Sequence, residues 1–257
     1  MTRAPYIGVT GFMHRHEVNT AIEILDGFGK KDVRNQRRLM VGVLASSKTL
    51  AGIPNKWPMR YPEPRMFASL FPPDRRTVNL IHYATDDQGT LKDQLLKLVS
   101  LGEYFFDGFQ LNMAWPEPRS IQLPNHLRMV LQLGDIALTE CGNDPKTAAK
   151  RLKEYNHVDQ QTSVITDVLI DGSCGHGTPL NAEKTEAYIA AITESCPNLG
   201  IGVAGGLSAE TLGSIKPLLK KYPRLSFDAE GKLRDADDHL DRAAMSTYIK
   251  DAYSLFH

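Results

Sequence analysis

Short apolar segments alternate along the chain with longer stretches in which apolar residues recur every three or four positions. The first pattern is typical of buried strands, and the second is typical of helices with one apolar face. The apolar segments predict eight strands, at Tyr6–Thr10, Leu39–Ala45, Thr77–Tyr83, Gly108–Met113, Leu127–Leu133, Thr166–Asp171, Gly200–Ala204 and Leu225–Asp228. The periodic stretches predict helices at His16–Phe28, Thr90–Leu101, Pro145–Tyr155, Asn181–Cys196, Ser208–Tyr222 (kinked near Pro217) and Asp237–Leu255.

This alternation of strands and helices predicts a single α/β domain over residues 1–257. Strands that alternate with helices pair in parallel through right-handed crossovers. Eight such units in a chain of 257 residues match the size and rhythm of a (β/α)8 TIM barrel. A doubly wound open sheet is the alternative. In a barrel, the residues that follow each strand gather at one end and form the site.

One stretch, Thr49–Arg76, interrupts the rhythm after the second predicted strand. It carries six prolines and four large aromatic residues in place of an ordinary helix. Long connections in compact domains are often functional lids, and the alternative is a surface excursion that packs its aromatic side chains on the barrel wall. Its position at the end of a strand favours the lid.

The composition of the chain argues against several classes of function. Lys plus Arg and Asp plus Glu each number 30, so no basic excess is available to hold nucleic acid. No apolar run approaches the length of a membrane span, and the first residues lack the apolar core of a signal peptide. The three cysteines form neither a disulfide framework nor a zinc spacing. We therefore expect a cytoplasmic protein with a small-molecule ligand, no nucleic-acid or membrane partner and no cofactor.

The last third of the chain places Gly-containing loops after successive strands. Leu199–Thr211 reads as a buried strand, a Gly-Gly turn and a helix that begins at Ser208. Glycines let backbone N–H groups approach a ligand closely, and a helix start adds unpaired N–H groups and a positive dipole end. A tight turn that binds nothing is the alternative. We predict a phosphate site at Gly205, Gly206, Gly231 and Lys232.

Carboxylates at strand ends are the candidates for acid–base chemistry. Asp171 ends the sixth strand, where burial can tune its pKa, although it could instead cap its own loop. Asp228 ends the eighth strand, and Glu230 follows it. His176 in the sixth loop is either a base, a phosphate donor or an exposed side chain. We predict that Asp171 is the acid and leave the base open among Asp228, His176 and Glu230.

Further polar side chains fall at or beside other strand ends. Amides at these places suit sugar hydroxyls, although buried amides also satisfy backbone groups. A lysine there could meet a carboxylate or a phosphate, although most lysines are merely solvated. The substrate-binding candidates of this kind are Lys48, His82, Gln110, Asn112 and Gln132.

A metal-dependent hydrolase is a third interpretation. His14 and His16 after the first strand have the His-x-His spacing of metal-dependent hydrolase barrels, and Asp228 fits their eighth-strand ligand. The fifth strand ends in Gln-Leu-Gly-Asp, without a histidine. Because this ligand set is incomplete, we predict no metal site.

The motifs of the strand ends together resemble phosphoribosylanthranilate isomerase, a phosphate-binding (β/α)8 barrel. The matching segments are Ser46–Lys48, Phe109–Asn112, Leu169–Asp171 with Cys174–Gly177, Val203–Leu207 and, more loosely, Phe227–Asp235. The resemblance implies a phosphoribosyl-type substrate, with Gly175 of the sixth loop among the substrate-binding residues. It also implies an isomerase that acts by paired acid and base, and a homodimer is one assembly that we consider.

The chain departs from this family at the first strand. The family's general base is a Cys at the end of that strand, where this sequence has Thr10 in Gly-Val-Thr-Gly. A hydroxyl does not ionise near neutral pH, so Thr10 is assigned to substrate binding and not to proton transfer. Two interpretations remain open at this point. Either another residue supplies the base for an isomerisation of a sugar phosphate, or the protein binds a phosphate ligand without catalysis.

Overall fold

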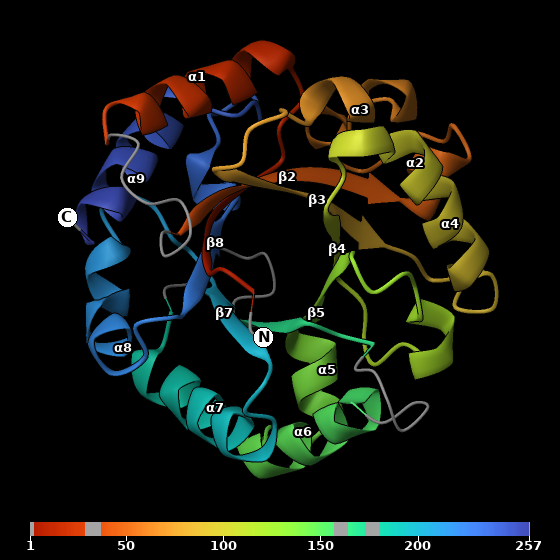
Figure 1. Ribbon diagram of the computed structural model, residues 1–257, viewed down its shortest axis with the longest axis vertical. Helices are drawn as coiled ribbons and strands as arrows, with labels where there is room; N and C mark the ends of the chain where they lie inside the picture. The colour runs from red at the N-terminus through yellow and green to blue at the C-terminus, as the bar shows by residue number, and fades with distance from the viewer. Residues whose placement is uncertain (1–2, 29–36, 157–163, 173–179, 257) are drawn as a thin grey trace.

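The computed structural model describes residues 3–28, 37–156, 164–172 and 180–256, and its core is a closed barrel of parallel strands (Figure 1). Every strand pairs with its sequence neighbours, and the last strand pairs with the first. The strands are β1 (Tyr6–Thr10), β2 (Arg38–Ser46), β3 (Thr77–Ala84), β4 (Gly108–Leu111), β5 (Arg128–Leu133), β6 (Asp167–Asp171), β7 (Gly200–Ala204) and β8 (Ser226–Ala229). The (β/α)8 fold predicted from the apolar segments is confirmed, and the open sheet is excluded.

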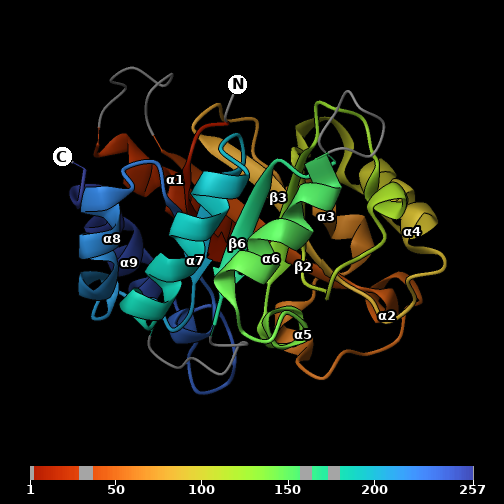
Figure 2. The ribbon, with the colours of Figure 1, turned by 90° about the horizontal axis from the view of Figure 1, so that it is seen from below.

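Helices form a ring outside the strands (Figure 1). The helices are α1 (Arg15–Asp26), α2 (Ser47–Leu50), α3 (Phe67–Leu70), α4 (Leu91–Gly102), α5 (Asp135–Glu140), α6 (Pro145–Leu152), α7 (Ala182–Ser195), α8 (Lys216–Lys221) and α9 (Arg242–Ser254). Side-chain caps fix several starts: Asp144, Asn181 and Asp241 each accept a hydrogen bond from a first-turn amide. Figure 2 shows α2 and α5 at the same end of the barrel, where their strands finish.

The strands are apolar on both faces because each face packs on a different layer. Residues that point outward join the large cluster between sheet and helices, such as Val9, Val41 and Phe109. A second, smaller cluster fills the barrel interior: Tyr6, Met40, Val78, Leu80, Val130, Leu169 and Ala204. Above this apolar layer, the same inward-facing positions carry polar residues.

Two predicted helices differ from the structure. No helix begins at Ser208, because the Thr211 hydroxyl accepts from the Ser208 amide and donates to the Gly206 carbonyl. This local turn delays the helix to a 3₁₀ turn at Leu212–Ile215, followed by the short α8 with Pro217 in its first turn. The last helix begins after its cap at Asp241 and not at Asp237.

The Pro-rich segment divides into two parts. Its second part contains α3, and Phe67, Leu70 and Phe71 are buried in the outer core against α1 and α4. Its first part contains α2 and a 3₁₀ turn at Pro58–Arg60, and it borders the carboxyl end of the barrel. The sequence allowed the segment to be a lid or an excursion that packs on the barrel wall. In the structure the first part has the position expected of a lid, and the second part packs on the barrel wall.

The opposite end of the barrel is closed by a buried ion pair. Arg128 Nε donates to Asp167 Oδ2 at 2.8 Å, and both side chains are 3% exposed. Arg128 also donates to the Ala4 carbonyl and lies over the Tyr6 ring. A buried pair is expensive to break because the remaining charge would be left without a partner. Among the described residues, no helix is long and apolar enough to span a membrane.

Candidate active site

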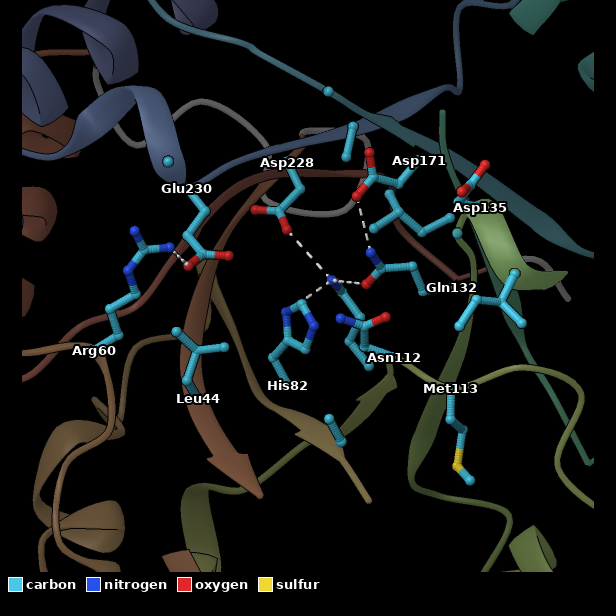
Figure 3. Close-up of a pocket in the computed structure, with 18 of the residues that line it drawn as sticks. Leu44, Arg60, His82, Asn112, Met113, Gln132, Asp135, Asp171, Asp228 and Glu230 are labelled. Atoms are coloured by element: carbon cyan, nitrogen blue, oxygen red, sulfur yellow. Dashed lines mark hydrogen bonds and ion pairs between the residues drawn. The ribbon is translucent and has the colours of Figure 1, made fainter. Parts of the chain in front are cut away.

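A cavity of about 750 Å³ opens at the carboxyl ends of the strands (Figure 3). Its floor is the polar layer above the barrel core. The candidates that line it are His82, Gln110, Asn112, Gln132, Asp171, Gly205, Gly206, Asp228, Glu230, Gly231 and Lys232. They come from strand ends and loops spread along most of the chain, and closure of the barrel brings them together.

One amide connects the polar groups of the floor. Gln110 Nε2 lies 3.2 Å from His82 Nδ1, 3.3 Å from Gln132 Oε1 and 3.4 Å from Asp228 Oδ2. Gln132 Nε2 in turn donates to Asp171 Oδ2 at 3.0 Å. Side chains from β3, β4, β5, β6 and β8 therefore form one continuous network, with a carboxylate at each end (Figure 3).

Asp228 is buried, and no cationic side chain among the described residues forms an ion pair with it. The Thr10 hydroxyl donates to its two oxygens at 3.1 and 3.0 Å. Burial raises the pKa of Asp228 to about 7, more than the bonds from Thr10 and Gln110 lower it, and the charges of Glu230 and Asp171 raise it further. Gly8 makes room for this carboxylate, since a Cβ at that position would lie 2.5 Å from Asp228 Oδ1. Asp228 can therefore exchange a proton near neutral pH.

Thr10 lies behind this carboxylate and does not line the cavity. Its side chain is fully buried, and its hydroxyl is directed to Asp228. Thr10 was predicted to contact the substrate, but in the structure its hydroxyl contacts Asp228, a candidate catalytic group.

His82 is buried beside Gln110 and is 6% exposed. Burial is the main reason that the pKa of His82 is lowered from its usual value, so the ring is neutral at neutral pH. Its Nδ1 faces Gln110, while Nε2 has no hydrogen-bond partner in the described part of the chain.

The Gly-Gly turn after β7 has the backbone that a close ligand contact requires. Gly205 and Gly206 have φ values of 126° and 58°, a region that favours glycine. Within the described ranges, neither amide donates to another group. Because no helix begins at Ser208, the turn lacks the N–H groups that a helix start would add. The amides of Gly205 and Gly206 are therefore the anion donors that this turn offers.

Glu230 is held by the Pro-rich segment. Arg60 Nη1 lies 3.0 Å from Glu230 Oε1, and Arg60 Nη2 lies 2.6 Å from Asp238 Oδ1. The bond to Asp238 is the largest cause of a raised pKa of Arg60 and of a lowered pKa of Asp238. Arg234 adds bonds to the carbonyls of Met59 and Gly11. This cluster, Arg60 with Glu230 and Asp238, fastens the segment to the loop after β8. Figure 3 shows the contact between Arg60 and Glu230.

The remaining candidates divide by position. Lys48 is exposed on α2 and does not line the cavity. His176 and Gly175 lie outside the described residues. Lining residues that the sequence analysis did not single out include Lys56, Trp57, Arg60 and Tyr61 of the Pro-rich segment. The polar and aromatic residues of that segment were the signal by which these lining residues could have been found, but nothing in the sequence connected the segment to β8.

No group of three or more potential metal ligands is found among the residues that the structure describes. His14 and His16 stack on each other at the start of α1, with ring centroids 5.3 Å apart. His14 is the residue that precedes the helix, and both side chains are exposed.

Known proteins were compared with the sequence and with this barrel. No family model and no curated protein matches the sequence. A solved phosphoribosyl anthranilate isomerase from Thermus thermophilus superimposes with a TM-score of 0.62 at 13% identity, covering 97% of this chain and 99% of that chain. The barrel is similar to phosphoribosylanthranilate isomerase.

A second isomerase structure, in complex with reduced 1-(o-carboxyphenylamino)-1-deoxyribulose 5-phosphate, has a TM-score of 0.62 at 12% identity and covers 99% of this chain and 100% of that chain. The catalytic domain of a Pyrococcus furiosus chitinase is also similar, with a TM-score of 0.54, 10% identity and coverage of 100% of this chain and 98% of that chain. Likeness at this level establishes the fold. Because one fold hosts many reactions, function has to be argued from the site.

Proposed function

We propose that the cavity binds a phosphorylated sugar or phosphoribosyl-type ligand and isomerises it by paired acid and base. The observation that carries the proposal is the pair of buried carboxylates, Asp171 and Asp228, on the floor of one cavity that also contains the Gly-Gly turn. An aldose–ketose isomerisation moves a proton between neighbouring carbons, so it needs two proton-transfer groups on one substrate.

Asp228 is the better base of the described candidates. Its pKa of about 7 allows it to be unprotonated at neutral pH and still bind a proton strongly. Glu230 is ion-paired with Arg60 and 26% exposed, so its carboxylate is already engaged by a cation of the Pro-rich segment. In the proposed reaction, the Asp228 carboxylate takes a proton from carbon and Asp171 supplies a proton to the substrate. Thr10 orients Asp228 through its hydroxyl.

The phosphate would bind at the backbone amides after β7 and β8. Gly205 and Gly206 line the cavity with amides that have no partner among the described residues, and Gly231 and Lys232 line it from the next loop. Backbone amides in such turns form anion-binding concavities. Lys232 would add a positive charge. A ligand held there would extend from the loops after β7 and β8 toward the floor carboxylates.

The experiment is a pH profile of isomerisation with a panel of sugar phosphates that includes ribose 5-phosphate, ribulose 5-phosphate and phosphoribosylanthranilate. With Asp228 as base, kcat/KM should rise about tenfold for each pH unit below about 7 and should no longer change with pH above it. Loss of this limb in Asp228→Asn, with ligand binding retained, supports the assignment. Tight binding without turnover by the wild type would instead indicate a phosphate-ligand binding protein.

A homodimer and a cytoplasmic location are further parts of this proposal. One of the similar solved structures is of monomers generated from a dimeric phosphoribosylanthranilate isomerase of Thermotoga maritima. Sedimentation of the purified protein tests the assembly, and fractionation of the source cells tests the location.

A further inference from the structure

Two polar atoms on the cavity floor have no partner among the described residues. They are His82 Nε2 and Gln110 Oε1, and both are buried. His82 and Gln110 also line the cavity. Buried polar atoms without a hydrogen bond are rare because each costs about 1–3 kcal/mol. Both atoms are covered in this structure, so a ligand oxygen that satisfies them has to displace the side chains that cover them.

The network determines which nitrogen of His82 carries the proton. Gln110 Nε2 faces His82 Nδ1 at 3.2 Å, and an amide nitrogen only donates. His82 Nδ1 must therefore accept, which leaves the proton of the neutral ring on Nε2. The unpaired atom of His82 is then a donor, and the unpaired Gln110 Oε1 is an acceptor.

The orientation of Gln110 is fixed by the carboxylates at the two ends of the network. If its amide were reversed, the oxygen would face Asp228 Oδ2 and Gln132 Oε1, both of which accept. Reversing Gln132 as well would place its oxygen against Asp171 Oδ2, which now accepts at 3.0 Å. With Asp228 ionised and no proton on Asp171 Oδ2, these two groups therefore orient both amides, and through them the tautomer of His82.

We propose that neutral His82 donates its Nε2–H to the substrate carbonyl oxygen on the carbon next to the one from which Asp228 takes a proton, with Gln110 as the positioning residue. This assignment rests on the proposed function. When the C–H bond breaks, its electron pair forms a C=C bond and negative charge develops on that oxygen. A preorganised donor in a buried site stabilises such charge strongly. The substrate class is thus an α-hydroxycarbonyl phosphate, whose hydroxyl hydrogen can bond to Gln110 Oε1.

The tautomer can be measured directly by NMR on protein labelled with ¹⁵N-histidine. The His82 signals are identified by their loss in His82→Gln. In the wild type we expect a neutral ring protonated on Nε2, and a mixture of tautomers in Gln110→Leu, which removes the donor to Nδ1. A ring protonated on Nδ1, or on both nitrogens, at neutral pH would overturn the inference even if the enzyme is active.

Binding and turnover test the role of the donor. Addition of ribulose 5-phosphate should shift the His82 Nε2 signal, and no shift at saturation would contradict the contact. His82→Leu should lower kcat about 10²–10³-fold with a change in KM below about tenfold, because the donor acts on charge formed in the transition state. His82→Gln places an N–H in a similar position and should recover most of the loss. His126→Gln, exposed at the other end of the barrel, is the matched control.

The two hypotheses fail in different ways. If His82→Leu turns over sugar phosphates as well as the wild type does, the donor role is refuted and the acid–base proposal stands. A wild type that binds ribulose 5-phosphate at His82 but exchanges no proton refutes the isomerase proposal and not the contact. Unchanged kcat in His82→Leu, with the fold intact by circular dichroism, is the kinetic result that would overturn the inference.

Discussion

Replacing Asp228 by Asn should stabilise the protein at high pH and leave its stability nearly unchanged at low pH. The folded state raises the pKa of Asp228 to about 7 from an ordinary value of 3.8, chiefly because the carboxylate is buried. Well below pH 3.8 the group is protonated in both the folded and the unfolded states. As the pH rises toward 7, the unfolded chain loses this proton and the folded chain retains it, so the free energy of unfolding falls.

The size of the effect follows from proton linkage. A tenfold change in proton affinity corresponds to ~1.4 kcal/mol, so a pKa raised from 3.8 to about 7 costs on the order of 4 kcal/mol above pH 7. Asn has the same shape and no charge, and its oxygen can still accept from Thr10. The Asn variant should therefore gain a few kcal/mol at pH 8 and little at pH 4, while its activity is lost.

Urea unfolding of the wild type and of Asp228→Asn at pH 4, 6 and 8 measures the difference. Asp167→Asn is the matched control, because Asp167 is equally buried but paired with Arg128. Breaking that pair should destabilise the protein by about 3–5 kcal/mol. A stability difference between Asp228→Asn and wild type that is the same at pH 4 and pH 8 would refute the assignment of a raised pKa to Asp228.

Three further predictions concern the loops and the first strand. Gly206→Ala should weaken binding of sugar phosphates, measured by calorimetry, whereas Gly142→Ala should not: Gly142 has a similar φ of 63° in a loop that does not line the cavity. Hydrogen exchange in 49–63 should slow when a sugar phosphate binds, and Arg60→Gln should speed it by breaking the contact with the loop after β8; equal rates in all states would make the segment a static wall. The wild type should show little or no phosphoribosylanthranilate isomerase activity by loss of substrate fluorescence, because Thr10 stands where the family that the chain resembles has its cysteine base; efficient turnover would show that Asp228 or another residue serves as base in that reaction too.

The strands were predictable because burial on both faces leaves a continuous apolar run. β1 and β7 agree with their predicted bounds, and the other strands differ by one or two residues at their ends. Barrel closure then turns strand ends into a site, which is why Gln110, Gln132, Asp171 and Asp228 could be predicted to lie together without any contact in the sequence. Their separate roles in one network depend on side-chain direction, which periodicity does not specify.

The errors have local physical causes. Ser208 has the composition of a helix start, but its amide bonds to the Thr211 side chain and the chain makes a turn first. The helices α2, α3 and α5 are too short to produce a periodic pattern. Arg60 could not be predicted as part of the site, because its partners, Glu230 and Asp238, lie 170 and 178 residues away in sequence. Thr10 was predicted at the correct strand end, but its hydroxyl is directed to Asp228 and not to the cavity.

Deuterium incorporation from D2O into sugar phosphates tests the central claim most directly, because it detects proton exchange at carbon whether or not the equilibrium favours product. The wild type, incubated with the panel that contains ribulose 5-phosphate and examined by NMR, should label at least one sugar phosphate at the carbon beside its carbonyl. Asp171→Asn and Asp228→Asn should each bind that ligand and abolish labelling, since losing a positioned acid or base costs about 10²–10⁴ in rate. Labelling that continues undiminished in both variants, or its absence in a wild type that binds the ligand, would contradict the account.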